Sequence, residues 1–141
     1  MTDRQSTPKV GDIWEYPYLW AWQADHGETE GRKARPCALT LVNRKQDNLT
    51  EVILVPITTK EPVAGSHFVE VPQIEKRRAG LDERLRLWVI CDEFNSDMPE
   101  RSYYFEPDGL IGALSIKFTK QVQAELVRAI KARKSVRISR R

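Results

Sequence analysis

The sequence has no long hydrophobic run: none of its apolar stretches approaches the roughly 20 residues that a membrane-spanning helix needs. Residues 1–9 also lack the apolar core of a secretory signal, so we expect a cytoplasmic protein with no membrane partner. Cysteine and histidine are scarce, with two of each, and none lies at the short spacings that metal sites use. We therefore expect no metal and no other cofactor, and interpret Cys37 and Cys91 as buried thiols rather than a disulfide.

Internal repeats, low-complexity tracts and linkers long enough to separate two domains are also missing from the sequence. A chain of 141 residues suits one core, because single domains usually hold roughly 100–150 residues. Charged residues make up 30% and hydrophobic residues 40%, a balance typical of globular proteins. We predict a flexible N-terminus over residues 1–9, a single domain over 10–133 and a basic tail over 134–141.

The net charge of +3 is unevenly distributed along the chain. Residues 117–141 contain nine Lys or Arg against one acid, whereas the preceding residues carry 14 Lys or Arg against 19 acids. A basic C-terminal face attracts nucleic acid or an acidic protein partner, or serves only to keep the protein soluble. The final residues, 135–141, show no core-forming pattern, and we expect them to be mobile.

Residue patterns predict short strands first and one long helix last. The predicted strands cover residues 12–22, 35–42, 52–59, 67–71 and 85–91, and the first is interrupted by Pro17. Residues 72–78 are compatible with a short helix that Gly80 ends, and residues 92–99 are acidic and turn-rich. The fold expected is mainly β, a small and strongly bent antiparallel sheet or barrel.

The last helix is predicted from apolar residues that recur every four positions between residue 116 and about residue 133. Ser115 is its expected N-cap, although Thr119 would cap a shorter version. An amphipathic helix of this kind buries one face, so we expect it to cover one open side of the sheet.

Two of the predicted strands carry a single polar residue at one edge. Arg35 opens the first and Thr58 closes the second. If the strands pair as a hairpin through residues 43–50, they run antiparallel and bring these two residues close together. A cation beside a hydroxyl suits a phosphate. The same residues are also common as a solvated strand-edge arginine and a turn-forming threonine, so spacing alone leaves both interpretations open.

The order of five short blocks resembles the bacterial growth-inhibitor toxins of the MazF/PemK family. The blocks are Val10–Trp14, Arg35-Pro36 with its apolar run, Val55–Thr59, Ala79–Leu81 ahead of a strand ending in Cys91-Asp92, and Gly112–Ser115. The resemblance implies an SH3-like small barrel of the MazF/PemK/CcdB kind that forms a homodimer. It also implies the toxin of a type II toxin–antitoxin system, an endoribonuclease that cleaves single-stranded RNA without a metal and is inhibited by a cognate antitoxin.

The resemblance also implies roles for individual residues. Arg35 matches the catalytic arginine that clamps the phosphate, and Thr58 matches the catalytic threonine. Asp92 matches an aspartate that some members use as a base, but those members have an arginine two residues earlier, where this chain has Ile90. His26 lies in a loop where some members carry a histidine, and a solvated loop histidine is the alternative.

Further candidates concern RNA binding. They are Arg32, Lys33, Thr59, Trp20 and Trp22. Both tryptophans follow Tyr16 and Tyr18 at period two, so in a regular strand all four would share one face, as core, dimer interface or base-stacking surface. The second hypothesis is a catalytically silent barrel that binds nucleic acid or protein. Ile90 and the acidic bias of residues 1–116 favour it, because RNA-binding grooves are usually basic.

Overall fold

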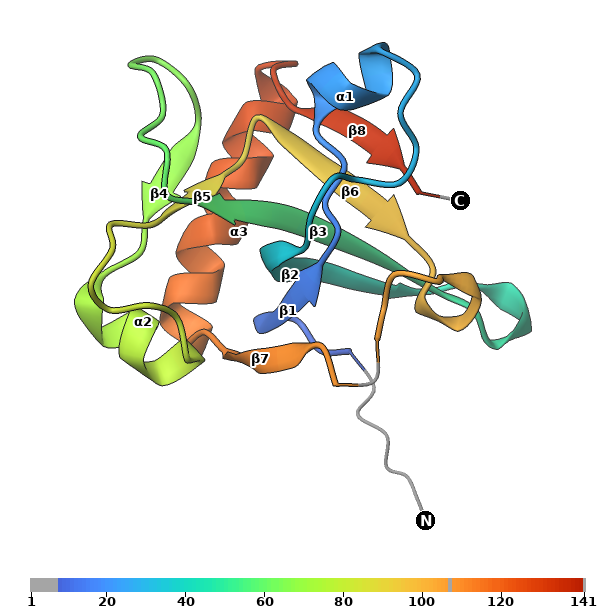
Figure 1. Ribbon diagram of the computed structural model, residues 1–141, viewed down its shortest axis with the longest axis horizontal. Coiled ribbons are helices and arrows are strands. Elements are labelled where there is room, and N and C mark those ends of the chain that lie inside the picture. The colour runs from blue at the N-terminus through green and yellow to red at the C-terminus, as the bar shows by residue number, and fades with distance from the viewer. Residues whose placement is uncertain (1–7, 107, 141) are drawn as a thin grey trace.

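The computed structural model of the chain describes residues 8–106 and 108–140. It is mainly β with a C-terminal helix, as predicted (Figure 1). The strands are β1 (Asp12–Tyr16), β2 (Arg35–Arg44), β3 (Thr50–Thr58), β4 (Phe68–Glu70), β5 (Trp88–Ile90), β6 (Glu93–Asp97), β7 (Leu110–Ala113) and β8 (Val136–Ser139). The helices are α1 (Ala21–Asp25), α2 (Gln73–Ala79) and α3 (Ile116–Lys131). No helix within the described ranges is long and apolar enough to cross a membrane.

All eight strands belong to one open sheet. Its main order is β4-β5-β3-β2-β1-β7, and β6 pairs with both β3 and β8. Neighbouring strands are antiparallel except for β6 and β8, which are parallel. The sheet presents two faces, each with its own apolar core.

The hairpin of β2 and β3 forms the centre of the sheet and confirms the predicted pairing. Its register places Cys37 opposite Pro56 and shifts at a bulge between Leu39 and Leu41. Because side chains alternate between faces, Cys37 and Leu39 lie on one face with Val52 and Leu54, and Ala38, Ile53 and Val55 lie on the other. Arg35 and Thr58 keep this alternation and therefore belong to the same face as Cys37.

The C-terminal helix covers the opposite face, as Figure 1 shows. Phe118, Val122 and Leu126 are buried in a core with Ile57 and Val89. The Ser115 side chain accepts a hydrogen bond from the Phe118 N–H at 3.1 Å, which confirms the predicted N-cap. The alternative cap, Thr119, instead lies inside the helix.

The predicted strand over residues 12–22 is wrong beyond Tyr16. Pro17 ends β1, and Trp22 lies in helix α1. The four aromatic residues therefore do not share one face of a strand: Tyr16 and Tyr18 are buried, whereas Trp22 is 49% exposed. The predicted strand over residues 85–91 is also shorter, since only Trp88–Ile90 pair as β5.

Two stretches expected to lack regular structure are strands. Residues 92–99 contain β6, whose polar side chains are buried because each has a partner: Asp97 bonds Tyr16, Asn95 bonds Leu19 and Ser96 bonds Glu51. The basic tail is not mobile over residues 136–139, which pair with β6 as β8. A flexible N-terminus was expected over residues 1–9, of which positions 1–7 lie outside the described residues.

We predict that both thiols are unreactive in the folded protein. Burial raises the pKa of Cys91 to about 12 and also raises the pKa of the fully buried Cys37. Because the thiolate is the reactive form, alkylation at pH 8 should be negligible under native conditions and complete in denaturant, as measured by mass spectrometry. Rapid labelling of either cysteine in the native protein would contradict this burial.

Candidate functional site

One cavity brings together cations and aromatic rings from the start of β2 and from the segment around α1. Its volume is about 310 Å³. The residues that line it are Tyr18, Trp20, Trp22, Gln23, Arg32, Lys33 and Arg35. We call this cavity the tryptophan–arginine pocket. Among its residues are the predicted phosphate clamp and four of the five predicted RNA contacts.

Polar side chains of β6 hold the segment that carries the two tryptophans. Glu93 Oε1 accepts hydrogen bonds from the Tyr18 hydroxyl at 3.1 Å and from the Ala21 N–H at 2.8 Å. Asn95 bonds both backbone groups of Leu19, accepting from its N–H at 2.9 Å and donating to its carbonyl at 2.8 Å. These bonds fix the entry to α1, and burial raises the pKa of the Glu93 carboxyl.

Two cations of the pocket, Lys33 and Arg35, have no carboxylate partner among the described residues, and Arg35 is the less exposed of the two. Its backbone is fixed by pairing with Tyr16, and its guanidinium carbon lies 5.0 Å from the centre of the Trp20 ring. The Nε atom is buried and makes no hydrogen bond, and no carboxylate of residues 8–106 or 108–140 pairs with the guanidinium. A buried donor without an acceptor is unfavourable, so the site favours an anionic ligand.

Arg32 lies on the second tryptophan. Its guanidinium carbon is 4.7 Å from the centre of the Trp22 ring, and its Nη2 lies 2.7 Å from Glu28 Oε2. Hydrogen bonding by Arg32 lowers the pKa of Glu28. This ion pair is exposed, and exposed pairs contribute little to stability, so Arg32 can exchange the carboxylate for a phosphate at small cost.

Thr58 lies at the same end of the hairpin as Arg35 and on the same face, but it does not line the pocket. The pairing of β2 with β3 ends at Cys37 and Pro56, two residues short of Arg35 and of Thr58, which pair with Tyr16 and Trp88. The Thr58 hydroxyl accepts a hydrogen bond from the Lys60 N–H at 3.1 Å. Thr59 follows the strand and is exposed. The Thr58 hydroxyl therefore stabilises the turn that follows β3.

Asp92 is engaged away from the pocket, with a residue that sequence reasoning missed. Its carboxylate accepts from the His67 N–H at 3.1 Å and lies 3.1 Å from His67 Nδ1. His67 is one of only two histidines, and no sequence motif marks it as functional. Its strand and that of Cys91 were both predicted, but only the pairing of Phe68 with Ile90 brings His67 beside Asp92. Ile90 itself is apolar and supplies no proton.

His26 borders the pocket from outside. Its ring lies 6.2 Å from the Trp22 ring in an edge-on arrangement, and its Nδ1 is 2.6 Å from the Trp22 carbonyl oxygen. The side chain is exposed. His26 therefore lies at the end of α1 and next to a lining residue, without itself lining the pocket.

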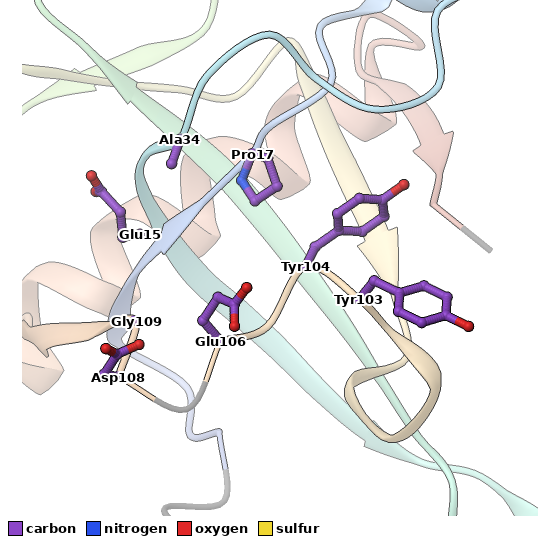
Figure 2. Close-up of a pocket in the computed structure, with 8 residues that line it drawn as sticks. All are labelled: Glu15, Pro17, Ala34, Tyr103, Tyr104, Glu106, Asp108 and Gly109. Atoms are coloured by element: carbon purple, nitrogen blue, oxygen red, sulfur yellow. The ribbon is translucent and has the colours of Figure 1, made fainter.

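A second cavity, shown in Figure 2, has the opposite electrostatic character. Its volume is about 340 Å³, and its lining includes Glu15, Glu106 and Asp108 together with Tyr103 and Tyr104. Three carboxylates repel a phosphate chain. The tryptophan–arginine pocket is therefore the better candidate for a nucleic acid.

We predict that Trp22→Ala weakens binding of single-stranded RNA without unfolding the protein. The side chain is half exposed, so the core is unaffected, whereas loss of one stacked base costs roughly 1–3 kcal/mol, or about 5- to 150-fold in affinity. Fluorescence anisotropy and thermal melting measure the two effects. Tyr103→Ala, which removes a 92% exposed ring outside the pocket, should change neither. Equal affinities for Trp22→Ala and the unchanged protein would contradict a stacking role.

No group of three or more His, Cys, Asp and Glu side chains in the described part of the chain is arranged to hold a metal ion. Comparison with known proteins adds no assignment: no family model matches the chain, and no curated protein matches it.

Proposed function

We propose that this protein is a toxin of a type II toxin–antitoxin system, an endoribonuclease that holds single-stranded RNA in the tryptophan–arginine pocket and cleaves it without a metal. The observation that carries the proposal is the uncompensated Arg35 guanidinium between Trp20 and the hairpin end. Single-stranded RNA offers both ligands that such a site accepts, since its bases stack on aromatic rings and its phosphates bind arginine.

In the proposed reaction the ribose 2′-hydroxyl loses its proton and its oxygen attacks the adjacent phosphorus. The bond from phosphorus to the 5′ oxygen breaks, and that oxygen takes up a proton, leaving a 2′,3′-cyclic phosphate and a 5′-hydroxyl. Arg35 would stabilise the negative charge that builds on the phosphate oxygens. Thr58, on the same face and at the same end of the hairpin, would donate its O–H to that phosphate, because accepting from the Lys60 N–H leaves the hydroxyl proton available. Asp92 and its partner His67 lie outside the pocket, so they would move a proton only for RNA that extends beyond the pocket to reach them.

A second candidate function is RNA binding without cleavage. It is favoured by one observation, that neither Thr58 nor Asp92 lines the pocket that contains Arg35. The hydroxyl is bound by a turn and the carboxylate by His67. In this alternative, Arg35 binds a phosphate and nothing completes the reaction.

The proposed assembly is a homodimer of bent, SH3-like barrels that also binds a cognate antitoxin. An apolar groove between α3 and the hairpin supports a protein partner. The groove has a volume of about 410 Å³ and contains the half-exposed residues Leu41, Val127 and Ile130. Apolar clusters exposed on a single chain often mark a surface that a protein partner covers.

The decisive experiment incubates the purified protein with a long single-stranded RNA in EDTA and analyses the product ends. Cleavage that leaves cyclic phosphates and 5′-hydroxyls, and that is lost with Arg35→Ala or with 2′-deoxy substrate, supports the endoribonuclease. Binding without cleavage across varied sequences supports the second candidate. If the protein neither binds nor cleaves RNA, both candidate functions are overturned.

A further inference from the structure

Arg140 lies just beyond β8, in the tail that the sequence predicted to be mobile. It is only 8% exposed. Its backbone N–H donates to the Ser96 carbonyl at 2.8 Å, which continues the pairing of β8 with β6. The side chain therefore starts from a fixed backbone and points into the protein.

The Arg140 guanidinium joins three separate parts of the chain. Nη1 donates to the Pro17 carbonyl at 2.8 Å and to Asn95 Oδ1 at 3.0 Å. Nη2 donates to the carbonyls of Thr29 at 3.3 Å and Glu30 at 3.2 Å. Only the planar fork of arginine reaches oxygens on so many sides, since lysine has a single nitrogen.

The loop between α1 and β2 is held from other directions as well. The Tyr104 ring lies 4.0 Å from the Arg140 guanidinium carbon, and its hydroxyl is 3.4 Å from the Thr29 carbonyl oxygen. Gly31 has φ +77°, and a Cβ at this position would lie 2.4 Å from the Pro17 carbonyl oxygen. Residues 29–31 are thus clamped between Arg140 and Pro17, and Figure 1 shows this loop beside the end of β8.

The two residues that follow the clamp are Arg32 and Lys33, which line the tryptophan–arginine pocket. Arg32 is also restrained by a solvent-accessible ion pair with Glu28, which contributes little, and by its contact with the Trp22 ring. Lys33 lies two residues before the start of β2. A loop with Gly27 and Gly31 would otherwise sample many conformations. The clamp on the carbonyls of residues 29 and 30 therefore restricts the backbone from which both cations extend.

We propose that Arg140 is a positioning residue for RNA binding: by clamping residues 29–31 it presets Arg32 and Lys33 in the pocket, without touching RNA itself. The inference rests on the proposed RNA-binding function of that pocket. It assigns the C-terminal strand a part in the RNA site, through one buried side chain.

The first test compares Arg140→Lys with Arg137→Lys, two changes that preserve net charge on the same segment. Arg137 pairs with Glu51 and Ser96, away from the pocket. Arg140→Lys should weaken binding of a single-stranded RNA about tenfold. It should also reduce the slope of log K against log salt concentration by about 1.4, as expected for two lost phosphate contacts. Arg137→Lys should change neither. Unchanged affinity and salt dependence for Arg140→Lys would overturn the proposal.

A double-mutant cycle separates positioning from general destabilisation. In a chain that already carries Arg32→Ala and Lys33→Ala, Arg140→Lys should weaken binding by less than twofold, because the side chains through which it acts are gone. A full, additive loss would overturn the proposal. If Arg140→Lys fails to fold, Gly31→Ala disturbs the same clamp from the Pro17 side and replaces it in the cycle.

Hydrogen exchange of the free protein makes the clamp testable without RNA. Arg140→Lys should accelerate exchange over residues 27–34 while β2 and β3 keep their protection. Equal exchange in this loop would overturn the clamp. If the unchanged protein does not bind RNA, the proposed function fails, and this measurement decides the clamp alone.

Discussion

Replacing Arg35 with Gln is expected to lower RNA cleavage by about 100-fold or more, and RNA affinity by about tenfold. The reason is that Arg35 supplies the cation fixed at the start of β2, against Trp20, and no carboxylate in the described ranges pairs with it. Single-turnover cleavage and anisotropy titrations measure the two effects. Thermal stability should fall little, because the Nε atom has no hydrogen bond to lose and the contact with the Trp20 ring contributes only about 0.5–1 kcal/mol.

Arg44→Gln is the matched control for that change. Arg44 is exposed and ends the same strand at the far side of the hairpin, so its loss removes an equal charge away from the pocket. Cleavage and affinity should stay near those of the unchanged protein. A loss as large as that of Arg35→Gln would mean that net charge, rather than the pocket, governs RNA binding.

Replacing Asp97 with Ala is expected to destabilise the fold by about 3–5 kcal/mol. The buried carboxylate accepts hydrogen bonds from the Tyr16 hydroxyl at 2.6 Å, the Ser102 hydroxyl at 2.7 Å and the Met98 N–H at 2.7 Å. Burial, with the charge of Asp97, raises the pKa of Tyr16, which therefore stays protonated and donates. Without Asp97, these three donors lose their common acceptor inside the protein.

Chemical denaturation measures this loss. Asp97→Asn keeps an acceptor oxygen for Tyr16 and should cost less, about 1–2 kcal/mol. Asp82→Ala, which removes an exposed carboxylate paired with Arg84, should leave stability unchanged. An Asp97→Ala variant as stable as the unchanged protein would show that the Tyr16–Asp97 bond does not hold β1 against β6.

The sequence predicts the elements whose apolar residues follow one simple period. The hairpin of β2 and β3 and the helix α3 with its Ser115 cap are of this kind. Strand β6 is not, because the half-buried Glu93 and the buried Asn95 and Asp97 are polar, and their partners lie far along the chain. A local pattern contains no information about such partners.

The sequence predicts an arrangement of Arg35 with Thr58, but not the meeting of Arg35 with the two tryptophans. Arg35, Trp20 and Trp22 were each candidates, but their meeting depends on α1 replacing the expected strand. Strand β8 was missed because one buried apolar residue, Ile138, is too little for a periodic pattern. Arg140 lies beyond β8. The sequence does not distinguish a buried arginine from a solvated one, because the oxygens that accept its hydrogen bonds come from distant residues.

The most direct test of the tryptophan–arginine pocket is to map where RNA touches the protein. A single-stranded RNA containing 4-thiouridine is photo-crosslinked to the protein in EDTA, and the crosslinked residues are identified by mass spectrometry. Binding in the pocket predicts crosslinks at Trp20 and Trp22 that are lost when Arg35 is replaced by Gln. Crosslinks confined to the basic surface of α3, with none between residues 18 and 35, would contradict it.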